Sequence, residues 1–400
     1  MNWQKVPISQ LGRVVTGKTP PTKQRQYYDG DYPFITPSDL DYDTYKIRTT
    51  TTTLSEEAYA KFLNQFVTEN TVTFTCIASV GKIGIATTAS LTNQQINSII
   101  VNNEHDHCFI YYLLRNEARR ISAMCTGVAT PIINKGDFEK IEVKVPGLLA
   151  IERNIASILS AYDDLIENNR RRIQLLEEAA RLLYKEWFVH LRFPGHEHVK
   201  ITDGVPEGWR RKKISEVCET FGGGTPSTKV SEYWDGDITW IVPSDVTKNN
   251  SLVLLDSERK ITHRGLRESS AKLVPPDTIL MTSRASVGYF ALIDIEVCTN
   301  QGFINIVPYQ SELRMYLLFN LLSRVTEIRS NAKGTTYPEI SKGRFREMDI
   351  LIPSNVLLLQ FDKVAYDIIR QVRYLMRSNA HLVAARDLLL PRLMSGEVAV

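Results

Sequence analysis

The chain lacks the features of a membrane or secreted protein. Its 400 residues contain no apolar run of about 18 residues, the length that a membrane span needs. Its first residues lack the basic-then-apolar pattern of a secretory signal. It has only five cysteines, and they are widely scattered. An odd, scattered set does not build a disulfide framework and is typical of reduced thiols. We therefore expect a cytoplasmic protein without membrane contact.

Sequence signatures of catalysis are also missing. The chain has no Gly-x-x-x-x-Gly-Lys-Ser/Thr phosphate loop, no Gly-x-Gly-x-x-Gly fingerprint, and no Asp/Asn-Pro-Pro-aromatic tetrad of amino-methylating enzymes. It has no Cys-x-x-Cys pair, and the ligand types at 105–108 and 196–198 are adjacent in sequence, which seldom suits one tetrahedral metal. Ser38-Asp39 and Ser244-Asp245 offer hydroxyls without a matching histidine. We expect no enzyme activity, no metal site and no cofactor in this chain.

An excess of charge is missing as well. Lys and Arg number 48 against 45 for Asp and Glu, a formal net charge of +3. Typical nucleic-acid binders are strongly basic. Any surface of this chain that binds a polyanion must therefore be a local patch.

What the chain does contain is an internal repeat. Residues 3–40 and 209–246 align without a gap at a constant offset of 206, with 16 identities in 38 positions. Further blocks match at an offset of 207, namely Ala-Ser-Val-Gly at 78–81 and 285–288, Thr-Asn-Gln at 92–94 and 299–301, and Gly-x-x-x-Pro-x-Ile-x-Lys-Gly-x-Phe from Gly127 and Gly334. Two domains of one fold are therefore present.

Each copy mixes strand-like and helix-like segments. A β-rich run such as 71–78 is followed by an amphipathic stretch at 108–125, and 313–330 is the matching stretch of the second copy. Because the segments do not follow a regular βαβ order, we expect an α+β fold with a curved, largely antiparallel sheet. The predicted target domains are residues 1–147 and 209–354.

A long amphipathic helix is predicted after each copy, at 148–190 and 355–400. The predicted apolar seam consists of Ile151, Ile155, Ile158, Tyr162, Leu165, Ile173, Leu176, Ala180, Leu183 and Trp187 in the first helix, and of Phe361, Val364, Ile368, Val372, Leu375, Leu382, Leu389 and Leu393 in the second. The steps alternate between three and four, and Asn169 and Asn379 interrupt the two series.

A helix of about 55 Å outreaches a single domain of about 150 residues. We therefore expect the two helices to pack on each other as an antiparallel coiled coil that separates the domains. Residues 191–208 are the predicted linker, and Pro391 is expected to end or kink the second helix.

The order of these blocks resembles the specificity subunit of type I restriction-modification systems over nearly the whole chain. The blocks that carry the resemblance are Trp-x4-Ile-Ser with Gly-x-Thr-Pro-x-Thr-Lys at 3–23 and 209–229, Asp-Gly-Asp to Pro-Ser-Asp at 29–40 and 235–246, the Gly-x-x-x-Pro block that leads into the helix at 151–188, and residues 386–400. The resemblance implies two target-recognition domains, each of which reads one half of an asymmetric bipartite site in double-stranded DNA. It also implies two methyltransferase subunits and a restriction endonuclease/translocase subunit as partners, and these would bind S-adenosylmethionine, ATP and magnesium.

Residues of the repeated loops are the candidates for DNA contact. They are Lys18, Thr19, Lys23, Arg25, Thr130 and Lys135 in the first copy, and Thr225, Thr228, Lys229, Arg284, Thr336, Tyr337, Lys342 and Arg344 in the second. Basic side chains favour phosphate contacts. Arg284 replaces Ile77 at a matched position and can read a guanine bidentately. For each residue taken singly, the alternative is a solvated or turn-building role.

A second interpretation applies to the chain as a whole. A two-domain scaffold could hold protein partners without touching nucleic acid. The nearly neutral charge favours such a scaffold, whereas the divergent loops on duplicated domains favour DNA reading.

Overall fold

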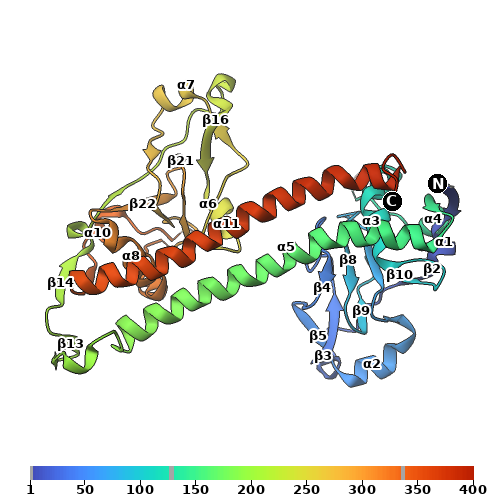
Figure 1. Cartoon of the computed structure of the whole chain (residues 1–400), viewed down its shortest axis with the longest axis horizontal. Coiled ribbons are helices and arrows are strands. Elements are labelled where there is room, and N and C mark those ends of the chain that lie inside the picture. The colour runs from blue at the N-terminus through green and yellow to red at the C-terminus, as the bar shows by residue number, and fades with distance from the viewer. Residues whose placement is uncertain (1–2, 126–129, 335–337) are drawn as a thin grey trace. The chain divides into compact units, whose positions relative to one another are not determined.

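Both copies of the repeat and the helices that follow them are seen in the computed structural model (Figure 1), which describes residues 3–125, 130–334 and 338–400. Two of the candidate contacts, Thr336 and Tyr337, lie outside the described residues. None of the helices in the described part of the chain combines the length and apolar character of a membrane span.

The chain divides into two units, and both long helices are shared between them. Unit 1 comprises Met1–Glu167 and His381–Val400, and unit 2 comprises Asn168–Ala380. The helices are α5 (Leu149–Tyr184), which continues as a π-helical turn over Lys185–Val189, and α11 (Asn355–Met394), green and red in Figure 1. Unit 1 therefore consists of two segments that are far apart in the sequence.

Unit 1 contains a five-stranded sheet of order β2-β10-β7-β8-β4, a four-stranded sheet of order β5-β3-β9-β6 and the antiparallel pair β1-β11. The strands are β1 (Trp3–Pro7), β2 (Gly12–Thr16), β3 (Tyr28–Ile35), β4 (Lys46–Ile47), β5 (Thr52–Leu54), β6 (Phe66–Val67), β7 (Val72–Thr75), β8 (Ile83–Ala86), β9 (Ser90–Thr92), β10 (Ile96–Val101) and β11 (Glu142–Pro146). The shorter helices are α1 (Ile8–Leu11), α2 (Glu56–Phe62), α3 (His107–Ala123) and α4 (Lys135–Lys140). Only the pairs β3·β9 and β4·β8 are parallel among the strands described here.

Unit 2 repeats this plan with sheets of order β15-β22-β19-β20 and β17-β16-β21-β18 and the pair β14-β23. Its strands are β14 (Arg210–Lys213), β15 (Cys218–Phe221), β16 (Trp234–Ile241), β17 (Lys260–Ile261), β18 (Leu273–Val274), β19 (Ile279–Thr282), β20 (Phe290–Leu292), β21 (Val297–Thr299), β22 (Phe303–Pro308) and β23 (Asp349–Ile352). Its shorter helices are α6 (Pro243–Thr247), α7 (His263–Arg267), α8 (Arg314–Ser323), α9 (Val325–Ser330) and α10 (Lys342–Arg346). The predicted α+β class with two repeated domains is confirmed.

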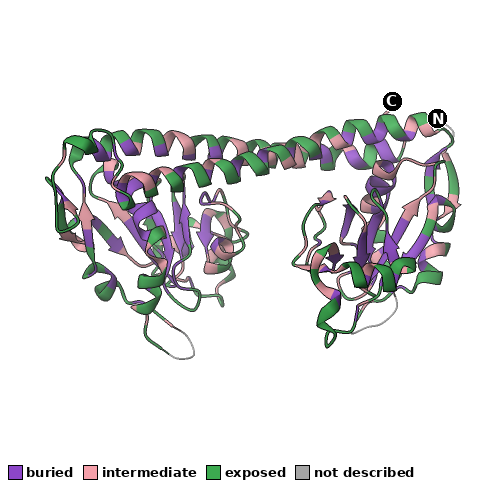
Figure 2. Cartoon of the chain, turned by 90° about the horizontal axis from the view of Figure 1, so that it is seen from below, coloured by how far each residue is buried: buried purple, intermediate pink, exposed green. Residues whose placement is uncertain are grey.

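One helix is buried at the centre of each unit. In α3 the six consecutive residues from Phe109 to Leu114 are all buried, as are Met315 to Leu321 in α8. A helix that is apolar on all sides must be covered on all sides. Sheet strands cover α3 on one side, and the long helices belong to the same cores. Figure 2 shows the buried strands inside each unit and the exposed loops around them.

Three local expectations need correction. The predicted helix at 313–330 is broken at Arg324, which separates α8 from α9. Pro391 does not end the second helix, because α11 runs on to Met394. The predicted linker contains a short antiparallel pair, β12 (Ile201–Thr202) with β13 (Val205–Pro206).

The buried faces of α5 and α11 also differ from the predicted seam. Ile158, Leu165 and Val364 are exposed. The buried or partly buried faces match at a constant offset of 210, and consist of Glu152, Ile155, Leu159, Asp163, Ile166, Asn169, Ala180 and Tyr184 on α5 and of Asp362, Ala365, Ile369, Arg373, Met376, Asn379, Leu390 and Met394 on α11. The apolar pattern pointed to a neighbouring stripe because several residues on the true inner face are charged or polar.

These inward polar groups have partners in the domain that they cover. The Glu152 carboxylate accepts the backbone N–H of Asp106 at 2.8 Å and lies 2.8 Å from His105 Nδ1, at the start of α3. Asp362, at the equivalent place in unit 2, accepts the backbone N–H of Met315 at 3.2 Å at the start of α8. Because the first N–H groups of a helix have no partner within it, a carboxylate there is stabilising. The long helices thus cap the central helices.

A buried ion-pair network joins the end of α11 to the rest of unit 1. The Arg386 side chain is fully buried and pairs with Asp163 of α5, with Asp43 at 2.5 Å and with Asp387 at 3.0 Å. Arg115 of α3 extends the network to Asp43 at 2.6 Å. A buried charge without its partner is costly, so this network fixes which stretch of α11 meets α5 in unit 1.

We expect Arg386→Met to destabilise unit 1 by about 3–5 kcal/mol, because Asp163 would remain buried without its cation. The double variant Asp163→Leu with Arg386→Leu should recover most of this loss. On the same helix, Arg370 forms an exposed pair with Asp367 at 3.0 Å, so Arg370→Met is the matched control and should cost less than about 1 kcal/mol. Urea unfolding measures all three, and equal losses for Arg386→Met and Arg370→Met would contradict the assignment.

Candidate nucleic-acid interface

Four loops from the repeated blocks are joined in each unit. In unit 1 they are residues 17–23, 92–95, 76–81 and 130–135, and in unit 2 they are residues 223–229, 299–302, 283–288 and 338–342. We refer to each set as a loop layer. Backbone hydrogen bonds link neighbouring loops, among them Cys76 N–H to Gln95 O at 2.7 Å and Ser283 N–H to Gly302 O at 2.8 Å. The loop layer is therefore one connected surface in each unit.

The glycine loops dock on the Thr-Asn-Gln loops. Lys18 N–H donates to Thr92 O at 2.8 Å, and the Thr19 hydroxyl donates to the side-chain carbonyl of Gln94. In unit 2 the Thr225 hydroxyl donates to Gln301 in the same way. A Cβ on Gly17 would lie 2.1 Å from the Thr92 carbonyl oxygen. Glycine is required there because the two backbones approach so closely.

The Ala-Ser-Val-Gly blocks form a strained turn in both units. Ala78 and Ala285 have φ values of 63° and 61°. An L-residue with a Cβ rarely adopts this left-handed conformation, at a cost of about 1–2 kcal/mol. The same hydrogen bond holds each alanine, from Ala78 N–H to Pro131 O and from Ala285 N–H to Pro338 O, both at 2.9 Å. Strain kept at equivalent places in two domains is typical of functional loops.

Next to each strained alanine lies one cross-strand residue pair. Ile77 pairs with Ile132 in unit 1, and Arg284 pairs with Glu339 in unit 2. Arg284 Nε lies 3.9 Å from the Glu339 carboxylate, and both side chains are more than half exposed. An exposed ion pair of this kind contributes about 0–1 kcal/mol, so Arg284 remains available to an outside acceptor.

The remaining candidates in unit 1 lie at the edge of its loop layer. Lys18 Nζ lies 5.5 Å from the centre of the Phe62 ring, and Lys23 and Arg25 are exposed. Within residues 3–125 and 130–334 and the final segment, these three cations have no ion-pair partner. Lys135 at the start of α4 pairs with Glu139 at 3.5 Å, and Thr130 is exposed.

The unit 2 candidates are placed in a similar way. Thr228 and Lys229 are exposed at the tip of the glycine loop. Lys342 Nζ lies 3.4 Å from where a Cβ of Gly222 would be, so this lysine joins the glycine loop to the start of α10. Arg344 Nε donates to Asn331 Oδ1 at 3.2 Å. Arg344 thus has an internal partner, unlike Lys229.

Sequence reasoning missed two glutamines of the loop layer. Gln94 and Gln301 are the acceptors for the conserved threonine hydroxyls of the glycine loops. Their identity in the two copies was the available signal. The Pro-Ser-Asp blocks, in contrast, have a structural role. Asp39 and Asp245 each accept the backbone N–H of the residue three positions before them, at 2.9 and 2.8 Å.

The two aspartates differ in acidity. Burial raises the pKa of Asp39, but hydrogen bonds from Thr36 and Thr51 outweigh burial and hold the pKa below its usual value. Burial dominates at Asp245 and raises its pKa. Neither aspartate activates the neighbouring serine, because its oxygens are occupied by the turn.

A protein-family model decides the identity of the chain. The model described as type I restriction modification DNA specificity domain matches residues 1–178 and 206–380, which is most of the chain and both copies of the repeat. The chain belongs to this family. It is a specificity subunit of a type I restriction-modification system, and its role there is not catalytic.

Relatives of this specificity subunit match over long stretches. It is 25% identical over 425 residues to the MjaIX specificity subunit of Methanocaldococcus jannaschii, which covers 100% of this chain and 94% of that protein. It is 29% identical over 309 residues to the HindI specificity subunit of Haemophilus influenzae, with 62% and 67% covered. The solved S subunit from M. genitalium has the same fold, with a TM-score of 0.61, 17% identity, and 98% and 96% of the two chains covered.

One cluster of metal-ligand types exists in the specificity subunit. Ligand atoms of Asp106, His107 and Cys108 lie within 4.8 Å of one another. Asp106 is already the N-cap of α3, where it accepts Phe109 N–H at 2.9 Å, and burial raises the pKa of the Cys108 thiol. A thiol must lose its proton to bind a metal, so the cluster fits a helix cap better than a metal site.

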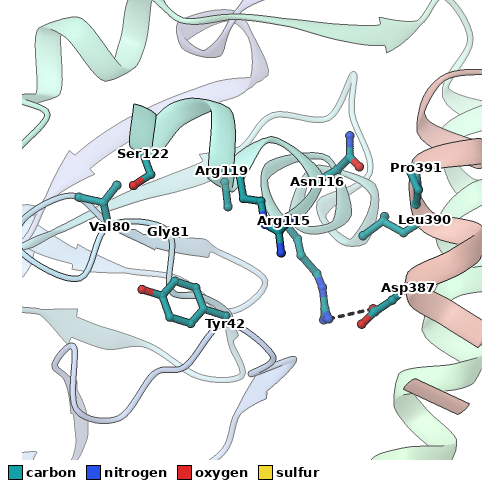
Figure 3. A pocket seen from close by; sticks show the side chains of 11 residues that line it. Tyr42, Val80, Gly81, Arg115, Asn116, Arg119, Ser122, Asp387, Leu390 and Pro391 are labelled. Atoms are coloured by element: carbon teal, nitrogen blue, oxygen red, sulfur yellow. Dashed lines mark hydrogen bonds and ion pairs between the residues drawn. The ribbon is translucent and has the colours of Figure 1, made fainter. Parts of the chain in front are cut away.

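Unit 1 of the specificity subunit also has a cavity of about 790 Å³ between α3 and the end of α11 (Figure 3). The cavity is lined by Tyr42, Val80, Gly81, Arg115, Asn116, Ala118, Arg119, Ser122, Asp387, Leu390 and Pro391. In unit 2, Arg329 replaces Ser122 and donates to the Val287 carbonyl at 3.0 Å. Because the second copy fills this place, the cavity is not part of the repeated framework.

Gly17→Ala should destabilise the specificity subunit by about 1–3 kcal/mol, because its Cβ would overlap the Thr92 carbonyl. Gly343→Ala is the matched control, since nothing lies within 4 Å of its Cβ position in α10. Alanine at this helical position should be neutral or stabilise the protein by about 0.5–1 kcal/mol. Thermal unfolding tests both, and an unchanged Tm for Gly17→Ala would mean that the two loops are not docked.

Proposed function

We propose that the two loop layers read the two halves of an asymmetric, bipartite site in double-stranded DNA. The target-recognition domains in this proposal are residues 1–147 and 209–354, followed by the helical segments 148–190 and 355–400, with 191–208 as the linker. The supporting observation is that both units keep the same hydrogen-bonded loop framework while the side chains on it differ. A constant framework with variable side chains suits two related readers of different sequences.

The local distribution of charge supports DNA as the ligand despite the net charge of only +3. Lys18, Lys23 and Arg25 gather at one loop layer without described ion-pair partners, and Thr225, Thr228 and Lys229 form the matching loop in unit 2. Cations of this kind contact phosphates and fix the register of a protein on the duplex. Thr130, Lys135, Lys342 and Arg344 belong to the same proposal, as do Thr19, Arg284, Thr336 and Tyr337.

We further propose that α5 and α11 form an antiparallel coiled coil. Two contacts within the units support it. In unit 2, Asn169 Nδ2 donates to Asn379 Oδ1 at 2.9 Å, and in unit 1, Asp163 of α5 pairs with Arg386 of α11. A polar residue within such a seam specifies which residues face each other, at some cost in stability.

The partners in this proposal supply the chemistry. Two methyltransferase subunits would bind S-adenosylmethionine, and a restriction endonuclease/translocase subunit would bind ATP and magnesium, all in the cytoplasm. The alternative is a scaffold that holds proteins without touching DNA. A gel shift of random duplex DNA with the chain and its methyltransferase separates the two, because a scaffold adds no sequence preference to the complex.

If the exposed cations contact phosphates, removing them should weaken binding equally on all sequences. Lys18→Ala and Lys23→Ala should each lower the slope of log K against log salt by about 0.9. Lys200→Ala removes an exposed lysine outside the loop layers and should leave the slope unchanged. Fluorescence anisotropy from 50 to 200 mM salt measures the slope, and the same slope in all variants would exclude these residues from the interface.

The chain alone should transfer no methyl group, hydrolyse no ATP and cleave no DNA. In the proposal those reactions belong to its partners. Assays with rigorously purified chain, S-adenosylmethionine, ATP and target DNA test this. Methylation that co-purifies with the chain through successive columns and disappears with its unfolding would refute the division of labour.

A further inference from the structure

The cross-strand pair beside each strained alanine is the same structural position in both units. Ile77 and Ile132 of unit 1 correspond to Arg284 and Glu339 of unit 2 at the common offset of 207. Main-chain hydrogen bonds flank each pair. Ile133 N–H donates to Cys76 O and Ile340 N–H to Ser283 O, both at 3.0 Å, opposite the alanine hydrogen bonds described above. The backbone at this position is therefore held identically in both units.

The geometry of the pair brings its two side chains together. Because hydrogen bonds flank the paired residues on both sides and do not join them directly, each pair is of the non-hydrogen-bonded antiparallel type, in which the side chains are closest and share one face. A short two-stranded ribbon of this kind fits the major groove of B-DNA. Ile132, Arg284 and Glu339 all have substantial exposure, at 40% for Ile132 and above half for the charged pair.

The chemistry of the pair is opposite in the two units. Two apolar side chains occupy the position in unit 1, and a cation with an anion occupies it in unit 2. Exposed isoleucines gain nothing from water, whereas they fit the methyl group of a thymine. Arginine matches the O6 and N7 acceptors of guanine, and a glutamate accepts from the N4 amino group of cytosine. One arginine and one glutamate side by side thus match the two bases of one G·C pair.

We infer that this cross-strand pair is a specificity-determining position of both domains. The Ile77–Ile132 pair selects an A·T base pair in the first half-site, and the Arg284–Glu339 pair selects a G·C base pair at the corresponding place in the second. This inference rests on the proposed function and deepens it, because it assigns a base class to each unit. The strained turn acts as the fixed mount, and the pair on it sets the preference.

Exchanging the pairs tests the inference in the full chain assembled with its methyltransferase. One variant carries Arg284→Ile with Glu339→Ile, and the other carries Ile77→Arg with Ile132→Glu. Selection from a random duplex library, followed by sequencing, gives the base preference at every position. We expect the first variant to lose its G·C preference at one position of the second half-site by roughly ten- to a hundredfold. The second variant should gain a G·C preference in the first half-site, with all other positions unchanged.

A matched control removes another exposed cross-strand ion pair from unit 2. Lys213 and Asp349 face each other on β14 and β23, with Nζ 2.9 Å from the carboxylate. Lys213→Ile with Asp349→Ile should leave the preference at every position as it is. A loss of preference in this control would mean that the exchange acts through stability.

A conservative variant keeps the test decisive if an exchanged pair does not assemble. Arg284→Lys keeps the charge and the neighbour Glu339 but loses the planar fork that guanine needs. It should lower the G·C preference at that position about tenfold with an unchanged Tm. An unchanged preference in Arg284→Lys, or in both exchanged variants, overturns the inference while the proposed function stands. If the unaltered complex selects no sequence at all, the proposed function itself is wrong.

Discussion

Asp163 and Arg386 are buried together, and neither could be buried alone. They are 223 residues apart in the sequence, and their pair joins α5 to the last turns of α11 within unit 1. A buried charge without its partner is far more costly than an exposed one, so the cation of α11 has one acceptable place. Unit 1 is therefore complete only when the final residues of the chain have returned to it, after unit 2 has been made. A subunit built from two similar domains can in this way have a single assembled form.

The same constraint explains the polar character of the inner faces of the long helices. Glu152 and Asp362 cover the first N–H groups of α3 and α8, which are buried and would otherwise lack acceptors. The central helices can be apolar on all sides because the long helices supply these caps. The long helices are thus part of each domain and not only a spacer after it.

The loop layers combine a rigid backbone with replaceable side chains. Glycine at Gly17 and Gly223 allows close docking of two loops, and hydrogen bonds hold Ala78 and Ala285 in a left-handed conformation. None of these features depends on the exposed side chains of the layer. Change at the exposed positions therefore leaves the framework intact, which is what a family of readers with different targets requires. A low net charge is compatible with this role because only the loop layer needs to be basic.

The sequence by itself determined the duplication, the α+β class, the two long helices and the family, because each of these leaves a pattern in residue order. It also identified the loops and most of the exposed candidates on them. It did not determine the inner face of the long helices. Steps of three and four fit two neighbouring stripes equally well, and the true one contains Asp163 and Glu152, whose partners lie far away in the sequence. Nor could it reveal that Ile77 faces Ile132 where Arg284 faces Glu339, because cross-strand partners are fixed by the hydrogen bonds of the folded loops and not by their spacing along the chain.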